Sequence, residues 1–455
     1  MYLSMKPIYA TLLSGILLTA SACSDLLDTE PYQQLEDESA IVDEGSARAA
    51  LLGTYSNLQA YYSLNYPVLG YLPADNVQFN GTLNQYLQVD QNALTADNVI
   101  ITDTWTQIYR TINSANNVIA VVPSVVDPAF TAAEKDQVIG EAYFLRALAY
   151  FDLGRGWGGV PLVTKPTRQL TDGTGIKRSS LSQTYDQVLT DLTEAERLLP
   201  EAFTRNRAVK NSARALRARL HLYREQWADA ETYATQVINN ATAYNLVKPY
   251  KTFFTAPFLS PESVFEVSFS TADQNNQWNN WYPSQLGGQY TLQPTTAFIT
   301  LANDASRGGS RKTLLGSVTT GNTTAIYGVL YNRDAQRDDP AYVIRLAEIY
   351  LIRAEARAHL AGKEAGALAD LNAVRNRADL GDLTLNNASD ILLAIEAERS
   401  IEFAFEAHRW FDLVRTKRAD DVLGITDERK WLFPIPFVEI NADPDLANDQ
   451  NPGYQ

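Results

Sequence analysis

The chain has 455 residues, and its 38 basic and 53 acidic side chains give a formal net charge of −15 at pH 7. Because phosphate binding needs a basic face and no run rich in Lys and Arg occurs, this balance argues against a nucleic-acid-binding protein. The single cysteine, Cys23, excludes an internal disulfide and a cysteine-based zinc cluster.

The first 22 residues have the features of an export signal. Lys6 supplies a positive charge, residues 8–20 are mostly apolar but too few to span a bilayer, and small residues precede Cys23. A cysteine at this place resembles a bacterial lipobox, which predicts removal of residues 1–22 and lipid attachment at Cys23. The alternative is a free cysteine buried in a helix. No run of 18 apolar residues follows, so we expect a protein anchored to a membrane rather than inserted in it.

Most of the chain after this segment has helical periodicity. In residues 213–238 apolar or small side chains recur every three or four positions, with a polar break at 224–226. This pattern predicts two antiparallel helices, and the same layout returns at residues 350–378 with Gly362 at the turn. Two such hairpins indicate a tetratricopeptide-like repeat, which stacks into a superhelical scaffold. Further helices are expected at residues 45–59, 102–121, 131–153, 181–199 and 389–416.

Residues 255–340 lack a sustained helical period. A short strand is predicted at 264–269, and the remainder is rich in Asn, Gln, Gly, Thr and aromatic residues. A long irregular stretch inside a compact protein usually carries function. We therefore expect one mainly α-helical domain over residues 23–455, with a ligand-binding, loop-rich part that contains short strands at about 255–340.

Motifs for catalysis and nucleotide binding are not found. The three histidines, His221, His359 and His408, fall on predicted helices, which favours structural roles. Residues 154–159 match the glycine pattern of a dinucleotide site, but they end a helix instead of following a strand, so we interpret them as a turn. No metal or cofactor site is predicted. A glycoside hydrolase with a pair of carboxylates stays a minority alternative.

Four segments together resemble the SusD/RagB family of nutrient-binding outer-membrane lipoproteins. They occur in order after the lipobox-like cysteine, and the resemblance covers nearly the whole chain, most weakly over residues 255–340. The segments are EAYFLRALAYF at 141–151 with WGGVPL at 157–162, IRLAEIYLIRAEA at 344–356, EAHRWFDLVR at 406–415 after Glu398-Arg399 and Glu402-Phe403, and FPIP at 433–436 with QNPGY at 450–454.

The resemblance implies a non-enzymatic lipoprotein exposed on the surface of the outer membrane. SusD-like proteins capture oligosaccharide or polysaccharide ligands and act as a hinged lid over a SusC-like TonB-dependent transporter, which their tetratricopeptide helices contact. The matching residues are mainly scaffold, and we expect Arg409 with Asp412, or Arg146 with Glu141, to form ion pairs that fix helix packing. A peptide-binding protein of the RagB type is the alternative, and a purely structural scaffold is the third.

A sugar site needs exposed aromatic rings beside short polar side chains, because a sugar has apolar C–H faces and a rim of hydroxyls. Trp278, Trp281 and Tyr282 lie among amides and glycines with little helical stripe to bury them, and Tyr290 follows. These four residues are therefore predicted to bind the ligand, with local core packing as the alternative.

A second aromatic cluster follows the first predicted helix. Tyr61 and Tyr62 lead to Asp75 and Asn76. In the family the loop after this helix contributes to ligand contacts, so Asp75 and Asn76 are candidates to bind hydroxyls. For the tyrosines, packing beneath the loop is the alternative. Three tryptophans on helical faces are expected in the core: Trp105, Trp227 and Trp410.

Overall fold

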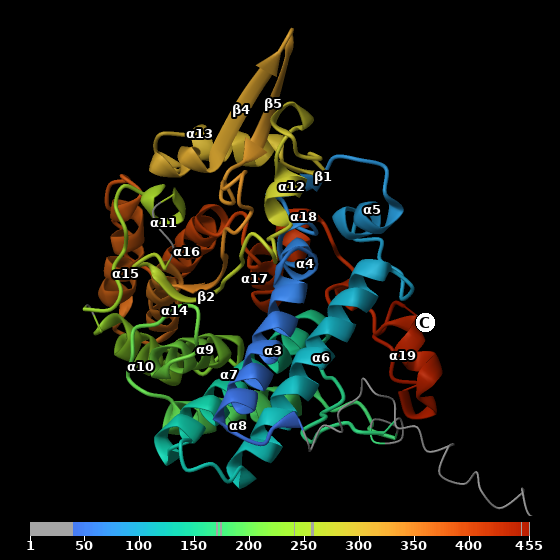
Figure 1. Ribbon diagram of the computed structural model, residues 1–455. Helices are drawn as coiled ribbons and strands as arrows, with labels where there is room; N and C mark the ends of the chain where they lie inside the picture. Colours follow the sequence, from blue (N-terminus) through green and yellow to red (C-terminus); the bar gives the residue numbers. More distant parts are fainter. Residues whose placement is uncertain are drawn as a thin grey trace, which may run out of the picture.

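The computed structural model describes residues 40–169, 172, 175–240, 242–255, 259–446 and 448–454. The predicted export signal, residues 1–22, and the predicted lipid attachment site, Cys23, lie outside these residues. Helices make up most of the described chain, and Figure 1 shows a two-stranded hairpin that projects above them. The prediction of a mainly α-helical protein with a loop-rich part and short strands is confirmed.

Long helices build the N-terminal part of the scaffold, and each packs on the next one along the chain. The Thr131 hydroxyl accepts a hydrogen bond from the Glu134 amide at 3.3 Å, and the Glu134 carboxylate accepts one from the Thr131 amide at 3.0 Å. Such a capping box satisfies amides at a helix start, so the start could be expected from the sequence. The helices are α3 (Glu44–Tyr62), α6 (Val99–Val121), α7 (Ala132–Trp157) and α8 (Leu181–Leu198).

The glycine-rich segment at residues 154–159 ends α7, as predicted. Gly158 has a φ of +81°, which favours glycine. A Cβ at Gly159 would lie 2.0 Å from the Ser179 carbonyl oxygen, so the chain approaches too closely for a side chain. The pattern therefore has a structural reason that does not involve a nucleotide.

Two helical hairpins continue the scaffold, as the repeat predicted. They are α9 (Lys210–Tyr223) with α10 (Trp227–Ile238), and α14 (Leu346–His359) with α15 (Glu364–Arg377). Gly362 has a φ of +77° in the second turn. Both α9 and α10 pack on α14, so the hairpins are stacked.

The helix expected over residues 389–416 is broken in two. It forms α16 (Ala388–Glu402) and α17 (Arg409–Arg415), with a non-helical segment between them. Glu406 in that segment is buried against Arg345 at 2.7 Å, and a Cβ on Gly70 would lie 2.5 Å from the Ala407 Cα. These long-range contacts outweigh the local helical pattern, since the buried carboxylate needs its partner.

Shorter elements connect and cover the scaffold. The short α-helices are α4 (Asn65–Tyr71), α5 (Asn84–Asp90), α11 (Thr252–Thr255), α12 (Gln277–Trp281), α13 (Thr296–Asn303), α18 (Ala419–Leu423) and α19 (Phe437–Ala442). The 3-10 helices are η1 (Val122–Ser124), η2 (Ser284–Leu286), η3 (Gly309–Leu314), η4 (Glu428–Lys430) and η5 (Pro444–Leu446).

The strands of the described residues form three separate antiparallel pairs. β1 (Val77–Phe79) pairs with β3 (Leu292–Pro294), and β2 (Ser263–Val267) pairs with β6 (Ala341–Arg345). β4 (Leu315–Thr320) and β5 (Thr323–Gly328) form the projecting hairpin. The strand predicted at 264–269 is thus confirmed as β2, shifted by one or two residues.

Candidate functional site

Three segments that the fold brings together contain no charged side chain: residues 76–89, 274–303 and 313–332. Charged residues make up 20% of the whole chain, and residues 49–74, 111–126 and 232–247 are uncharged as well. The three segments are therefore distinguished by lying together in the fold and not by their composition alone. Amides, hydroxyls and aromatic rings take their place.

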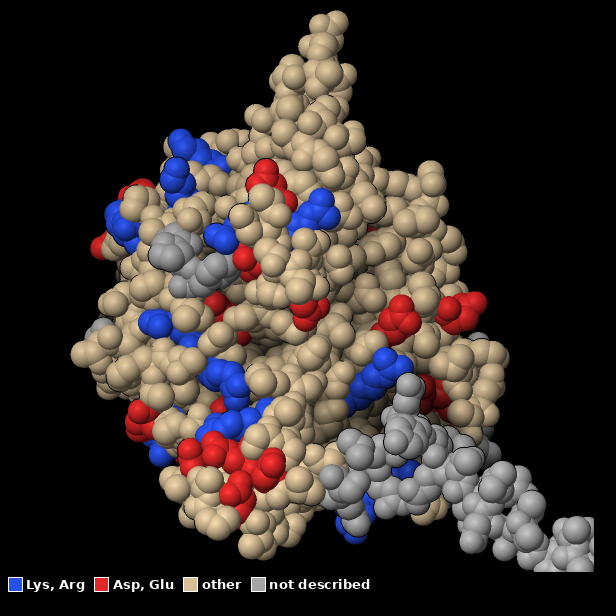
Figure 2. All heavy atoms as spheres, viewed as in Figure 1, with Lys and Arg blue, Asp and Glu red and all other residues tan. Residues whose placement is uncertain are grey.

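The fold brings the three uncharged segments together. Val77 of β1 pairs with Pro294 of β3, and the Tyr290 hydroxyl donates to the Ile326 carbonyl of β5 at 2.7 Å. Figure 2 shows the β4–β5 hairpin as a projection without acidic or basic side chains. We name the surface around these contacts the charge-free face. Its accessible side chains are Asn80, Tyr86, Asn279, Gln285, Gln289 and Tyr290.

Hydrogen bonds hold the charge-free face in one arrangement. The Asn80 side-chain amide donates to the Tyr290 carbonyl at 2.9 Å, and the Gln289 backbone amide donates to the Asn279 carbonyl at 2.7 Å. Burial raises the pKa of Tyr86 and of Tyr290, so both phenols are neutral near pH 7. The side chains of the three segments offer donors, acceptors and ring edges that carry no charge, which suits an uncharged ligand rich in hydroxyls. One charged group from outside these segments, the Arg337 guanidinium, lies over the Trp278 ring at 4.7 Å.

The predicted tryptophans lie in the core instead of on the surface. Trp281 is 1% exposed, and its indole nitrogen donates to Gln277 at 3.1 Å. Trp278 is 3% exposed and stacks on Tyr282 with the ring centroids 4.7 Å apart. The expected exposure of Trp278, Trp281 and Tyr282 is wrong, because this segment forms α12 and distant parts of the chain cover it. Phe405 packs on Trp281, Tyr327 packs on Tyr282, and the Arg337 guanidinium lies over the Trp278 ring. Tyr290 is half-buried and belongs to the charge-free face.

Tyr61 and Tyr62 are buried too, in agreement with the alternative of packing. Their hydroxyls donate to the Asp152 carboxylate at 3.2 Å and 2.8 Å. Burial, and then the charge of Asp152, raises the pKa of both phenols well above the ordinary value. The second aromatic cluster therefore stabilises α3 against α7 and presents no ring to a ligand in this structure.

Asp75 and Asn76 have partners within the protein. Asp75 accepts two hydrogen bonds from the Arg409 guanidinium, each 2.7 Å long, and the Asn76 amide donates to the Ser400 carbonyl at 2.7 Å. Asn76, a candidate to bind a hydroxyl, is buried in this structure, whereas Asp75 keeps part of its side chain accessible.

The four charged residues expected to fix helix packing do so with other partners. Arg146 pairs with Asp191 at 2.6 Å, and Glu141 pairs with Arg207 at 2.6 Å. Arg409 pairs with Asp75, and Asp412 pairs with Arg399 at 2.8 Å and with Arg415 at 2.9 Å. The structural role was predicted, but the pairing was wrong.

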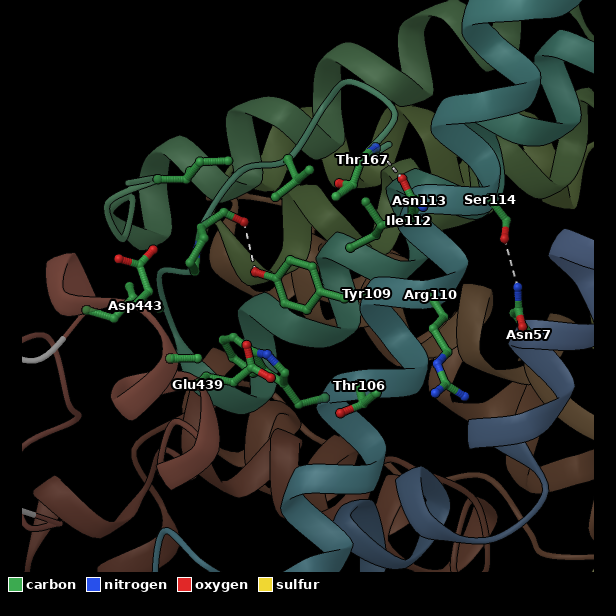
Figure 3. A pocket seen from close by; sticks show the side chains of 16 residues that line it. Asn57, Thr106, Tyr109, Arg110, Ile112, Asn113, Ser114, Thr167, Glu439 and Asp443 are labelled. Atoms are coloured by element: carbon green, nitrogen blue, oxygen red, sulfur yellow. Dashed lines mark hydrogen bonds between the residues drawn. The ribbon is translucent and has the colours of Figure 1, made fainter. Parts of the chain in front are cut away.

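A pocket of about 540 Å³ lies on another part of the surface, between α6, α19 and the chain that follows α7. Figure 3 shows Tyr109 in the middle of this pocket, with Glu439 and Arg110 on opposite sides of it. The Tyr109 hydroxyl donates to the Pro161 carbonyl at 2.8 Å. No sequence pattern pointed to this pocket, since its walls come from segments far apart in the chain.

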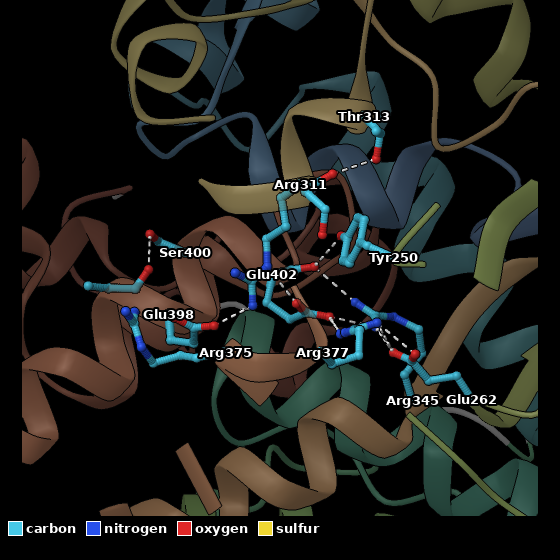
Figure 4. A network of polar contacts seen from close by, with 12 residues as sticks. Tyr250, Glu262, Arg311, Thr313, Arg345, Arg375, Arg377, Glu398, Ser400 and Glu402 are labelled. Atoms are coloured by element: carbon cyan, nitrogen blue, oxygen red, sulfur yellow. Dashed lines mark hydrogen bonds and ion pairs between the residues drawn. The ribbon is translucent and has the colours of Figure 1, made fainter. Parts of the chain in front are cut away.

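A buried network of ion pairs connects the hairpins with the loop-rich part (Figure 4). Arg345 contacts Glu262 at 2.6 Å, Glu402 at 2.8 Å and Glu406 at 2.7 Å. Arg311 and Arg377 also bind Glu402. Burial acts to raise the pKa of Glu402, but the charges of the three arginines outweigh it and lower the pKa.

The described residues show neither a metal site nor a membrane span. No group of three or more His, Cys, Asp or Glu side chains among them is placed to hold a metal ion. None of the described helices is both long enough and apolar enough to cross a membrane.

Sequence comparisons match two separate parts of the chain to models of SusD-like proteins. A model described as the SusD family matches residues 319–426, and a model described as starch-binding and associating with the outer membrane matches residues 25–222. The SusD-like protein P38 of Formosa agariphila is 26% identical over 95% of this chain and 96% of its own. The chain belongs to the SusD/RagB family.

Solved structures of SusD-like proteins have the same fold. A SusD superfamily protein of Bacteroides thetaiotaomicron aligns with a TM-score of 0.79 at 23% identity, over 90% of this chain and all of that one. A laminarin-binding SusD-like protein aligns with a TM-score of 0.77 at 23% identity, over 91% of this chain and all of that one. At these identities the likeness shows the fold.

Proposed function

We propose that this SusD-like protein captures oligosaccharides on its charge-free face and delivers them, as a lid, to a SusC-like TonB-dependent transporter in the outer membrane. The charge-free face is the observation that carries the proposal. One structural neighbour is a laminarin-binding protein, and one matching family model is described as starch-binding. Laminarin and starch are both uncharged polysaccharides. An uncharged surface of amides and phenols in a protein of net charge −15 has the chemistry that such ligands need.

The residues that would hold the glycan are the accessible amides and phenols of this face. Asn80, Gln285 and Gln289 are exposed and can each donate to and accept from a sugar hydroxyl. Tyr290 and Tyr86 offer half-buried ring surface to the apolar side of a sugar. Trp278 and Tyr282 lie directly beneath, where they stiffen the segment that carries these groups.

The proposed role is non-enzymatic and needs an anchor and a partner. The lipid attached at Cys23 would hold the protein at the cell surface after removal of residues 1–22. The stacked hairpins α9–α10 and α14–α15 would supply a surface for the transporter. The variant Cys23→Ser is expected to be lost from the membrane fraction, because it has no thiol for lipid attachment. A Cys23→Ser protein that stays on the cells would contradict the lipid anchor.

Affinity electrophoresis in laminarin and starch gels tests the face. The triple variant Asn80→Ala, Gln285→Ala, Gln289→Ala is expected to bind at least tenfold more weakly, because three hydrogen bonds contribute roughly 0.5–1.5 kcal/mol each. A matched control removes two exposed polar side chains of the α10 region, Gln236→Ala with Asn239→Ala, and should migrate like the unmodified protein.

Two results would count against this function. If the triple variant binds both polysaccharides unchanged while its melting temperature is unaltered, the charge-free face is not the glycan site. If calorimetry detects binding of a peptide mixture but no heat with either polysaccharide, the captured nutrient is a peptide.

A further inference from the structure

The pocket between α6 and α19 is lined by other residues than the charge-free face. It has a volume of about 540 Å³, within the range of roughly 300–1,000 Å³ that ligand pockets occupy. Aromatic rings of Trp105 and Tyr109, with centroids 5.0 Å apart, form part of its wall. Its residues lie outside the three uncharged segments, so the inference does not depend on the proposed glycan site.

Glu439 is the chemically distinctive group of the pocket. Its side chain is half-buried, and burial raises its pKa although the Trp105 indole donates a hydrogen bond to it. In the described part of the chain no Lys, Arg or His forms an ion pair with it. The nearby Arg178 guanidinium is occupied by the carbonyls of Trp157, Gly159 and Asp449.

The other charged groups of the pocket do not compensate Glu439. Arg110 is exposed and lies on the opposite side of Tyr109 (Figure 3). The Asp443 carboxylate accepts hydrogen bonds from the Gly175 amide at 3.1 Å and the Asp445 amide at 2.9 Å. A half-buried carboxylate without a counter-charge, beside two aromatic rings, is a site for a cation.

We propose that this pocket binds a small ligand with a primary ammonium group, which pairs with the Glu439 carboxylate and lies against the ring of Tyr109. An amino sugar and the amino terminus of a short peptide both carry this group. In either case Arg110, at the other side of the pocket, is free to meet an acidic or hydroxyl group of the same ligand.

Calorimetry on the purified full chain tests the proposal with three matched sugars and a dipeptide: glucosamine, glucose, N-acetylglucosamine and alanyl-alanine. An ammonium ligand should bind about tenfold or more tightly than glucose and N-acetylglucosamine, because a hydrogen bond to a charged group is the stronger kind. Glu439→Gln keeps the shape and should abolish this preference. Glu428→Gln changes an exposed carboxylate outside the pocket and should leave the preference intact.

A second variant separates the pocket from the rest of the surface. Ala442 is exposed at the pocket wall, so Ala442→Trp fills the space without removing a buried contact and should block the ammonium ligand. Whether glucosamine or alanyl-alanine binds more tightly identifies the source of the ammonium group. Equal affinity for glucosamine and glucose, absence of binding by either ammonium ligand, or binding that Ala442→Trp leaves unchanged would each overturn the proposal.

Discussion

The helical scaffold and the charge-free face differ in their content of charged side chains. Where the hairpins meet the loop-rich part, Arg311, Arg345 and Arg377 are buried and paired with glutamates. The three segments that form the charge-free face contain no Asp, Glu, Lys, Arg or His. Buried pairs specify one arrangement because each charge needs its partner. A surface without charge adapts to an uncharged ligand without competing counter-ions.

The largest expected effect comes from breaking the buried network. Arg345→Met leaves Glu262, Glu402 and Glu406 without their shared partner, so we expect the free energy of unfolding to fall by about 3–5 kcal/mol. Urea denaturation at pH 7 measures it. Arg429→Met removes an exposed pair with Asp427 and should lower the free energy of unfolding far less, because solvent screens that pair. Similar losses in the free energy of unfolding for both variants would show that the buried network contributes no more to stability than an exposed pair.

The variant Trp281→Ala tests whether a buried ring near the charge-free face contributes to stability alone or also to glycan binding. Because the ring is buried against Phe405, we expect a loss of about 3–4 kcal/mol in stability. Below the melting temperature, glycan affinity should stay within twofold of the unmodified protein. Leu286→Ala, at an exposed position of η2, is the control for stability. A large loss of affinity in a fully folded Trp281→Ala protein would show that the ring does reach the ligand.

The two regions should also respond differently to acid. Burial, and then the charges of Arg219, Arg399, Arg155 and Arg345, lowers the pKa of His408 well below its ordinary value of 6.5. As the pH falls below about 6.5, His408 therefore binds a proton in the unfolded chain but not in the folded chain. Stability should fall by about 1.4 kcal/mol per pH unit below that value.

The variant His408→Gln isolates this proton, since its stability should vary less with pH between 6.5 and 5.5. Glycan affinity should not change over the same interval, because no group of the charge-free face titrates there. An identical pH dependence of unfolding in both proteins would assign the effect to other groups. A pH-dependent affinity would contradict an uncharged site.

The smallest effect on stability is expected from adding a charge to the face. Gln289 is exposed, so Gln289→Glu should alter the free energy of unfolding by less than about 0.5 kcal/mol. Laminarin binding should nevertheless weaken, because the carboxylate keeps its water and donates no hydrogen bond. Gln236→Glu on α10 is the matched control. Unchanged binding by Gln289→Glu would show that the absence of charge at this position is incidental.

Helix positions could be predicted because their causes are local. The capping box of Thr131 with Glu134 and the periodicity of residues 213–238 lie within a few residues of the helices that they start or fill. The break between α16 and α17 could not be predicted, since Glu406 finds Arg345 61 residues away.

The candidate site was harder to predict for the same reason. Nothing near Trp281 in the chain indicates that Phe405 will cover it, and the partner of Asp75 is Arg409, 334 residues later. The uncharged segments at 76–89 and 274–303 can be read from the sequence without any knowledge of contacts, but residues 49–74 and 111–126 are uncharged too and lie largely in scaffold helices. The pattern of aromatic residues near amides led to Trp278 and Trp281, which are buried, whereas the exposed side chains of the same segment include Gln285 and Gln289.

The buried Asp152 carboxylate has more hydrogen-bond donors than a single substitution can remove. Asp152 accepts hydrogen bonds from the hydroxyls of Tyr61, Tyr62 and Tyr66, and Arg155 adds a fourth donor at 3.0 Å. Replacing one tyrosine with phenylalanine leaves the carboxylate with the remaining donors. The loss of one hydroxyl therefore weakens the cluster without leaving the buried charge unpaired, so this part of the core tolerates single Tyr→Phe substitutions.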